Sequence, residues 1–280
     1  MRERRTYRYL FLATATAALC LLSLRSHAAN ETDFVKIWQQ HIKHPDQHAE
    51  AIAACRKFST NNKGDELIRV VQGIEIWHLL KTNQNQEAVE ILESHLTSNS
   101  SRTGTGAAIM ARNWMSLLDI EPVKQALQYY YRKEVGYPKS LDALIGHPGI
   151  PVELKFSLND RWDHPWTYRL TGFKSAPGFR NQRYSISCSM LDTTTDLISA
   201  LQLPYASEIH ALPIYTRTTG NSSVVVEFAN WIGEQEEGQR FLLSVGKKSG
   251  DIFLAYVGEK LIIICDRIHW KVLPKPPGAS

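Results

Sequence analysis

The centre of the chain contains the stretch DRWDHPWTY, residues 160–168. Every second position of this stretch carries a ring: Trp162, His164, Trp166 and Tyr168. Because successive side chains of a β-strand point to opposite faces, this spacing predicts a strand with an aromatic row on one face. Such a row packs well against a helix. Pro165 has no backbone N–H to donate, so we expect an edge strand or one with an irregular start.

The residues before this stretch predict the helix on which the aromatic row packs. Apolar residues recur at helical spacing over residues 107–118 and again over residues 121–134. Pro122 lies in the first turn after a candidate cap at Asp119, where a missing N–H is tolerated. We therefore expect a kink or a restart of the helix there. Residues 99–106, NSSRTGTG, are typical of a connector and mark a boundary before the helix.

A turn and a second strand complete this unit. Gly136 is expected to end the helix through a left-handed backbone conformation, which glycine adopts without steric cost. Pro138 restricts Tyr137 to an extended conformation, so the chain changes direction there. Residues 184–187 supply the closing strand. Helix, turn and two strands predict a small α+β domain.

The same residues carry a resemblance to a known family. In chain order they are Asp119, Tyr130, Gly136, Tyr137, Pro138, Leu141, Leu144, Asp160, Trp162, Pro165, Trp166 and Tyr168. Over about residues 107–188 the chain resembles the C-terminal globular domain of type II secretion system protein G, the major pseudopilin. That family has a Gly-x-Tyr-Pro turn and an Asp-Pro-Trp-Gly-x-Pro-Tyr-x-Tyr signature. The resemblance implies structural roles for the twelve residues and contacts with other proteins of the cell envelope.

The chain departs from the family in ways that bear on function. Arg161 and Asp163 stand where the family has proline and glycine. Residues 188–192, CSMLD, replace the acidic, glycine-rich loop with which the family binds calcium, so we expect no calcium. The chain lacks the Gly-Phe-Thr-Leu-Ile-Glu-like processing site, and residues 25–106 separate its apolar N-terminal run from the predicted helix. We therefore expect a pseudopilin-like head that is not a filament subunit.

The N-terminus is typical of a secretory signal. Four arginines, Arg2, Arg4, Arg5 and Arg8, precede an apolar run over residues 9–24, and small residues follow. We predict a signal peptide over residues 1–28, cleaved near Ala28 or Ala29, and a periplasmic or secreted protein. A retained membrane tether is the alternative, although the run is shorter than the roughly 20 residues that span a bilayer.

The charges and the cysteines of the sequence each exclude one class of protein. The 280-residue chain has 32 basic and 28 acidic residues, and residues 1–28 hold five arginines and one glutamate, so the remainder has 27 of each sign. A balanced chain without a basic stripe does not fit a nucleic-acid-binding protein. Four cysteines exclude a dense disulfide framework, and the pairing of Cys55, Cys188 and Cys265 stays open.

The regions flanking the central domain differ from each other. Residues 30–98 predict helical hairpins, and within them residues 65–96 resemble part of a tetratricopeptide repeat. Barely one repeat is present, and such units need about three or more copies to stack, so a local hairpin is the simpler interpretation. Residues 205–274 alternate as strands, with a tight hairpin at Gly258 and Glu259. The predicted α+β order is signal peptide 1–28, helical region 30–98, pseudopilin-head-like domain 107–190 and antiparallel β unit 205–274.

No constellation of residues in the sequence predicts a catalytic, cofactor-binding or metal site. His41, His44 and His48 are close in sequence, but Pro45 interrupts any helix through them and no cysteine or acidic cluster adjoins them, so we expect a solvated polar segment. We therefore expect a non-enzymatic exported protein that acts through protein contacts. The alternatives are a hydrolase with a site between the central and C-terminal units, and a peptide-binding adaptor that uses Trp77 and its neighbours.

Overall fold

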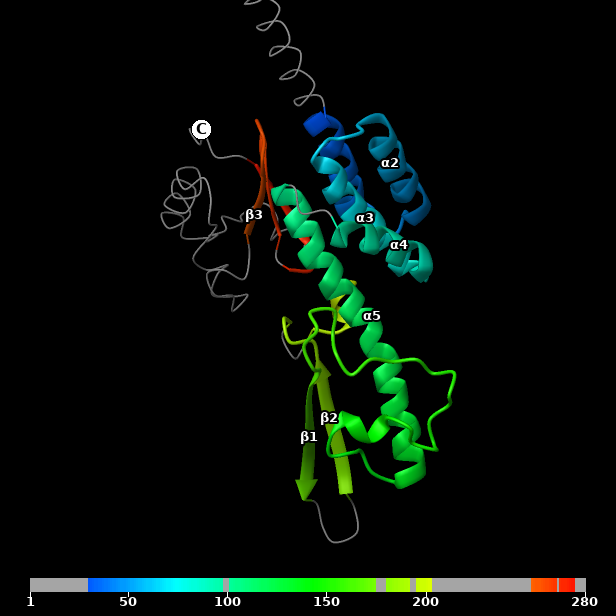
Figure 1. Ribbon diagram of the computed structural model, residues 1–280. Coiled ribbons are helices and arrows are strands. Elements are labelled where there is room, and N and C mark those ends of the chain that lie inside the picture. Colours follow the sequence, from blue (N-terminus) through cyan, green and yellow to red (C-terminus); the bar gives the residue numbers. More distant parts are fainter. Residues whose placement is uncertain are drawn as a thin grey trace, which may run out of the picture. The chain divides into compact units, whose positions relative to one another are not determined.

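The structure is a computed structural model that describes residues 30–97, 101–174, 180–191, 195–202, 253–265 and 267–274 (Figure 1). The predicted signal peptide and the strands predicted between residues 205 and 252 lie outside these ranges. Residues 30–43 are helical, and the further elements are α2 (His48–Asn61), α3 (Leu67–Lys81), α4 (Asn85–Leu96), α5 (Arg102–Glu134), η1 (Leu141–Leu144), β1 (Thr167–Lys174), β2 (Arg180–Ser187), α6 (Leu197–Ala200), β3 (Phe253–Val257), β4 (Leu261–Cys265) and β5 (Trp270–Pro274). Helices come first and strands last, so the predicted α+β class is confirmed. None of the described helices is both long and apolar enough to cross a membrane.

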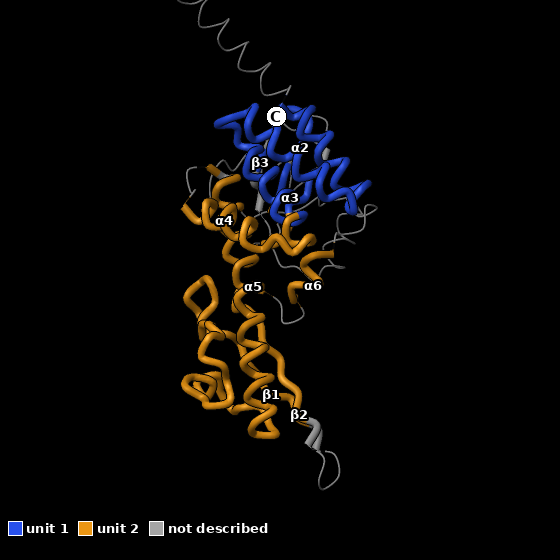
Figure 2. Tube along the Cα trace, turned by 90° about the vertical axis from the view of Figure 1, so that its right-hand side faces the viewer, with its two compact units in different colours: residues 1–78, 205–264, 270–280 blue, residues 79–204, 265–269 orange. Residues whose placement is uncertain are grey.

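The chain divides into two compact units, which Figure 2 shows in different colours. The first unit contains residues 1–78, 205–264 and 270–280. The second unit contains residues 79–204 and 265–269. The boundary falls inside α3 and again at the last residue of β4, so at these two points it does not coincide with a gap between elements.

In the first unit, the N-terminal helix binds the tip of a β-hairpin. The sheet order is β3-β4-β5, and the connection between β3 and β4 is short enough only for antiparallel neighbours. The buried carboxylate of Glu31 accepts hydrogen bonds from the backbone N–H groups of Glu259 (2.8 Å) and Lys260 (3.1 Å) and from the hydroxyl of Tyr256 (3.0 Å). This carboxylate satisfies backbone donors that the hairpin turn leaves unpaired.

A second close approach in this unit joins α3 to β5. A Cβ atom placed on Gly73 would lie 2.4 Å from Nε1 of Trp270. The buried indole of Trp270 therefore packs directly on the backbone of α3, at a position that only glycine permits. The helix begins close to Asp65, whose side chain accepts a hydrogen bond of 2.7 Å from the backbone N–H of Leu67.

The second unit is built on the long helix α5. The helix begins at Arg102 because the side chain of Ser101 caps it, accepting a hydrogen bond of 3.0 Å from the N–H of Gly104. The prediction of a connector through residue 106 is therefore wrong for residues 102–106. Of the two alternatives predicted at Pro122, a restart of the helix is wrong, since α5 continues through this residue. Proline removes one helical hydrogen bond there, and the buried residues Ile120 and Val123 on either side hold the helix to its core.

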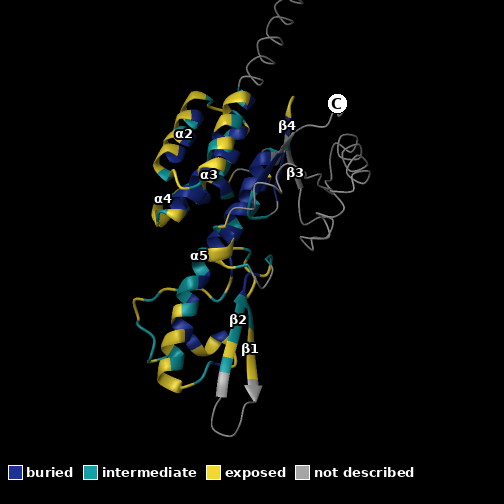
Figure 3. Cartoon of the chain, turned by 180° about the vertical axis from the view of Figure 1, so that it is seen from behind, coloured by how far each residue is buried: buried dark blue, intermediate teal, exposed yellow. Residues whose placement is uncertain are grey.

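The C-terminal part of α5 packs against η1 and the hairpin of β1 and β2. The hairpin is antiparallel, with Thr167 opposite Ser187 at one end and Lys174 opposite Arg180 at the other. Figure 3 shows β1 mostly exposed and β2 of intermediate burial. The core beneath the hairpin contains Ile120, Val123, Ala126, Leu127, Leu141, Leu144, Trp166 and Cys188. The predicted packing of the aromatic stretch on this helix is thus observed for Trp166.

Candidate functional site

The motif stretch turns around one buried carboxylate. Oδ1 of Asp160 accepts hydrogen bonds from the backbone N–H groups of Trp162 (2.8 Å) and His164 (3.1 Å). Oδ2 accepts from the thiol of Cys188 (3.2 Å) and from both the N–H (3.0 Å) and the hydroxyl (2.7 Å) of Ser189. Burial alone raises the pKa of Asp160, but these hydrogen bonds outweigh it and hold the pKa below its usual value. Asp160 therefore ties the turn to the chain just after β2.

The expectation of a strand from Trp162 onward is wrong. The strand β1 begins at Thr167, and the residues before it form a turn closed by a hydrogen bond of 2.8 Å from the N–H of Asp160 to the carbonyl of His164. Asp163 adopts a left-handed conformation, with φ of 59°. This conformation breaks the alternation of the ring positions, and His164 is exposed as a result.

The turn is fastened to α5 by polar side chains. Nε1 of Trp162 donates to the side-chain oxygen of Asn113 (2.8 Å), and the guanidinium of Arg112 lies 5.1 Å from the centre of the Trp162 ring. The backbone N–H of Arg161 donates to the hydroxyl of Ser116 (3.0 Å), and the guanidinium of Arg161 forms a two-bonded ion pair with Asp119.

The predicted turn after α5 is present but uses a different residue. The left-handed residue at the helix end is Val135, with φ of 54°, and not Gly136. A Cβ on Gly136 would lie 3.1 Å from the side-chain oxygen of Gln182 on β2. That oxygen accepts a hydrogen bond of 2.8 Å from the backbone N–H of Tyr137. Gly136 thus admits the Gln182 side chain, which holds the turn to the hairpin.

The remaining motif residues lie in the same core. The hydroxyl of Tyr168 donates to the carbonyl of Pro138 (2.8 Å), and burial, followed by the neighbouring tyrosines, raises the pKa of Tyr168 to about 12. Nε1 of Trp166 donates to the carbonyl of Ser157 (2.9 Å). Pro165 pairs with Asn159 in an isolated bridge. All twelve motif residues belong to the second unit: Asp119, Tyr130, Gly136, Tyr137, Pro138, Leu141, Leu144, Asp160, Trp162, Pro165, Trp166 and Tyr168.

Sequence reasoning missed the polar partners of the motif. Asn113, Ser116, Gln182 and Ser189 have no motif of their own. The available signal was that Asn113 and Ser116 occupy positions in a mostly apolar helical stretch, where a buried polar group needs a partner.

Three side chains at this turn are of the types found in a serine hydrolase, but their hydrogen bonds connect them differently. The hydroxyl of Ser189 lies 2.9 Å from Nδ1 of His164 and 2.7 Å from Oδ2 of Asp160. The hydroxyl has one proton, and when it donates that proton to the carboxylate, Nδ1 of His164 must be the donor to the hydroxyl. The imidazole then cannot act as the base that activates Ser189, in contrast to a catalytic triad. The arrangement is a structural anchor.

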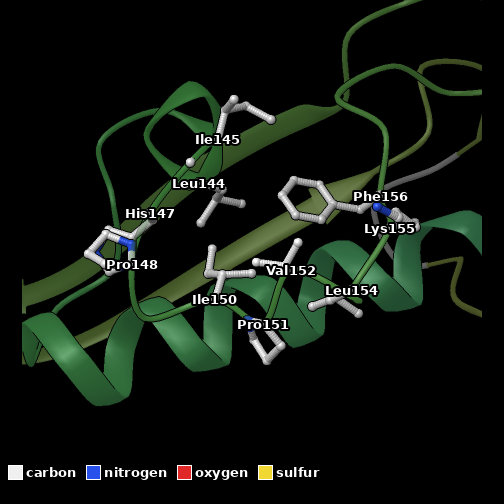
Figure 4. Close-up of a pocket in the computed structure, with 11 residues that line it drawn as sticks. Leu144, Ile145, His147, Pro148, Ile150, Pro151, Val152, Leu154, Lys155 and Phe156 are labelled. Carbon is white, nitrogen blue, oxygen red and sulfur yellow. The ribbon is translucent and has the colours of Figure 1, made fainter.

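An apolar groove opens beside this core. It has a volume of about 420 Å³, and its lining comes from the loop that follows η1, residues 144–156. In Figure 4, the side chains of Leu144, Ile150, Val152 and Phe156 point toward a common space. Two large apolar side chains of the lining are open to solvent, since Ile145 is 61% and Val152 is 83% exposed. An exposed apolar surface of this kind is typical of a contact site for another molecule.

The structure answers the question of cysteine pairing: Cys55, Cys188 and Cys265 are buried free thiols, and none of them forms a disulfide. Burial raises the pKa of Cys188 to about 11; the neighbouring Asp160 also raises it, while the hydrogen bond with the backbone of Met190 opposes the shift. The thiol therefore stays protonated and unreactive at neutral pH. No group of three or more His, Cys, Asp or Glu residues in the described part of the chain has the arrangement of a metal site.

In comparisons with family models, curated proteins and solved structures, nothing matches this chain.

Proposed function

We propose that this protein is an exported, non-enzymatic protein of the cell envelope, and that its second unit is a pseudopilin-G-like head that binds another protein. The order of elements supports the proposal: a long helix, a tight turn, a short helix and a two-stranded hairpin packed on the helix. The conformation of Asp163 also supports it, because its φ of 59° suits glycine, which the family motif has at this position. The protein is not a filament subunit in this proposal.

The observation that carries the proposed activity is the exposed apolar groove of residues 144–156. Val152 is 83% exposed although it is a large β-branched residue, and removing it from water would favour binding. Lys155 adds a positive charge to the lining. The occupant that fits is an extended segment of a partner protein with an apolar side chain next to a carboxylate, so that the apolar group fills the groove and the carboxylate faces Lys155.

Neither alternative function gains such support. Trp77, around which a peptide-binding adaptor would be built, is only 5% exposed. The hydrogen bonds of Asp160, His164 and Ser189 disfavour a serine hydrolase at that position, because Ser189 donates its proton to the carboxylate and not to the imidazole.

The groove is tested by two matched substitutions. Val152→Asp places a charge in the groove, whereas Val135→Asp changes an equally exposed valine (81%) outside its lining. The probes are two fluorescent extended peptides, one with leucine beside aspartate and one with leucine beside lysine. We expect the native protein to bind the aspartate peptide more tightly than the lysine peptide. Val152→Asp should weaken the binding of the aspartate peptide at least about tenfold, which corresponds to about 1.4 kcal/mol. Val135→Asp should leave this binding unchanged.

Crosslinking in cells tests the partner and the location. A photoreactive side chain at position 152 should crosslink a cell-envelope protein, and the same group at position 135 should not. N-terminal sequencing of the mature protein should begin near residue 29 or 30. Equal crosslinking at both positions, or no binding of either peptide, would overturn the proposed contact. Peptide cleavage that Ser189→Ala abolishes would show a hydrolase in its place.

A further inference from the structure

Three histidines from three different segments meet inside the first unit. His41 lies on the helix of residues 30–43, His48 is the first residue of α2, and His78 lies on α3. Nδ1 of His41 is 3.0 Å from Nε2 of His78, and Nδ1 of His48 is 2.9 Å from Nδ1 of His78. Both ring nitrogens of His78 are therefore hydrogen-bonded to another imidazole. We call these three residues the histidine trio.

The prediction of a solvated polar segment is wrong for His41. His78 is fully buried and His41 is 4% exposed, while His44 is exposed as expected. The turn at Pro45 and Asp46 separates the first helix from α2, so that buried His41 and half-buried His48 both contact His78 on α3. The sequence could not show this because the partner, His78, lies 37 and 30 positions away from them.

Aromatic rings surround the histidine trio. The ring centre of Trp77 lies 5.0 Å from that of His41 and 6.1 Å from that of His48, and Trp38 lies 5.7 Å from His41. Burial, with a smaller effect of His48, lowers the pKa of His78 to about 4.

Most of the charged side chains on the segments that carry the trio are exposed or are bonded to residues outside the trio. On the first helix, Glu31 binds the β-hairpin, Asp33 pairs with Lys36, and Lys43 is exposed. On α2 and α3, Glu50 is exposed, Arg56 pairs with Glu75 at 2.7 Å, and Arg69 bonds Gln72. Lys271 on β5 is buried. Among the described residues of this unit, the trio is thus a group whose mutual hydrogen bonds depend on how many protons its rings hold.

Counting hydrogens shows how many protons the trio can hold. A neutral imidazole has one N–H and one acceptor nitrogen, and a protonated one has two N–H groups. With no added proton, His78 donates to one neighbour and accepts from the other. One added proton also keeps both bonds, because a charged His78 can donate to both neighbours and a charged neighbour can donate to a neutral His78. With two added protons, at least one of the two contacts brings N–H against N–H, and that bond is lost.

We propose that His41, His48 and His78 form an acid-sensitive latch, which holds together the three helices that carry these residues when at most one proton is added, and which opens when a second proton binds. This inference concerns the first unit and does not depend on the proposed function of the second. Separated imidazoles have a pKa of about 6.5. Well below that pH, the open form therefore holds three added protons, one on each ring, whereas the closed form holds at most one added proton. Opening then takes up two or more protons, and the opening equilibrium rises about 100-fold or more for each unit of falling pH.

The test uses the full mature chain and hydrogen exchange measured by mass spectrometry. Protection factors of peptides from residues 30–81 are compared between pH 7.5 and 4.5, after correction for the intrinsic exchange rate. We expect constant protection above about pH 7 and a steep loss below about pH 6, with a slope near two protons. His48→Gln removes one ring from the trio and should reduce the slope by at least one proton. His44→Gln, at an exposed histidine four residues away, should behave as the native chain does.

A second measurement covers variants that fold poorly. In ¹⁵N-labelled native protein, the ring nitrogens of three histidines should titrate together and not as independent groups. The proposal is overturned if protection in residues 30–81 is independent of pH between 7 and 5. It is also overturned if His44→Gln and His48→Gln have the same slope, or if three independent ring titrations occur while protection is unchanged.

Discussion

The indole Nε1 of Trp162 donates a hydrogen bond of 2.8 Å to the side-chain oxygen of Asn113. Asn113 is fully buried on α5, and its amide nitrogen donates in turn to the backbone carbonyl of Arg267 (2.8 Å). One amide therefore orients the motif tryptophan and also holds the short segment of residues 265–269 to the helix. Both hydrogen bonds are within the second unit.

Removing this amide should destabilise the second unit. We expect Asn113→Ala to lower the free energy of unfolding by about 2 to 3 kcal/mol, because the indole N–H of Trp162 and the carbonyl of Arg267 both lose their hydrogen-bond partner. Combined with Trp162→Phe in a double-mutant cycle, it should show a coupling of about 1 kcal/mol. Urea unfolding followed by circular dichroism measures both. Trp166→Phe is the control, because its indole bonds Ser157 instead, and its effect should add to that of Asn113→Ala. Additive effects of Asn113→Ala and Trp162→Phe would contradict the coupling.

Asp160 should stabilise the fold more when it is ionised than when it is protonated. Asp160→Ala leaves several buried or partly buried donors without an acceptor and should cost about 3 kcal/mol. Because the folded pKa of Asp160 is lower than the unfolded one, the part of its contribution that depends on the negative charge is present above about pH 4 and is lost as the pH falls through the folded value. Unfolding experiments at pH 6 and pH 2 should therefore show a larger difference between the native and variant chains at pH 6 than at pH 2.

The neighbouring acid provides the control for this prediction. Asp163→Asn removes a negative charge from the same turn, but Asp163 is exposed and asparagine tolerates the left-handed conformation. It should change the free energy of unfolding by less than about 0.5 kcal/mol. A loss as large as that of Asp160→Ala would mean that charge, and not the hydrogen bonds, sets the effect.

Val135→Gly should stabilise the protein. Val135 is a β-branched residue with φ of 54° and is 81% exposed, so it has backbone strain and contributes little burial. Glycine relieves the strain, with an expected gain of about 1 kcal/mol. The same substitution at Gln128, an exposed position inside α5, should cost about 1 kcal/mol. Thermal unfolding of the two variants should shift the midpoint in opposite directions, and a shift in the same direction would contradict the strain at Val135.

Gly258→Ala should weaken the link between Glu31 and the hairpin. A Cβ on Gly258 would lie 1.7 Å from Oε1 of Glu31, so the carboxylate must move away and release the N–H groups of Glu259 and Lys260. We expect a cost of about 2 kcal/mol or more, and hydrogen exchange should increase at these two amides. Gly172→Ala is the control, since nothing lies within 4 Å of its added Cβ. Unchanged exchange in Gly258→Ala would rule out the role of Glu31.

The sequence by itself determined the local structure of this protein. Apolar spacing gave the course of the helix over residues 107–134, Pro138 marked the turn, and the closing strand was predicted at residues 184–187, within β2. These features depend on neighbours a few positions apart, and such neighbours share a face of a helix or strand. The same reasoning failed at residues 162–166, because it assumed a regular period where the left-handed Asp163 interrupts it.

Only the tertiary structure decided which polar groups meet. The bonds from Glu31 to the hairpin, from Trp162 to Asn113 and from His41 to His78 join residues that are 225 to 229, 49 and 37 positions apart. Periodicity shows that a side chain is buried, but a buried polar group is stable only beside a partner, and the partner is set by how distant segments pack. For that reason the anchor at Asp160, the histidine trio and the open groove after η1 became visible only in three dimensions.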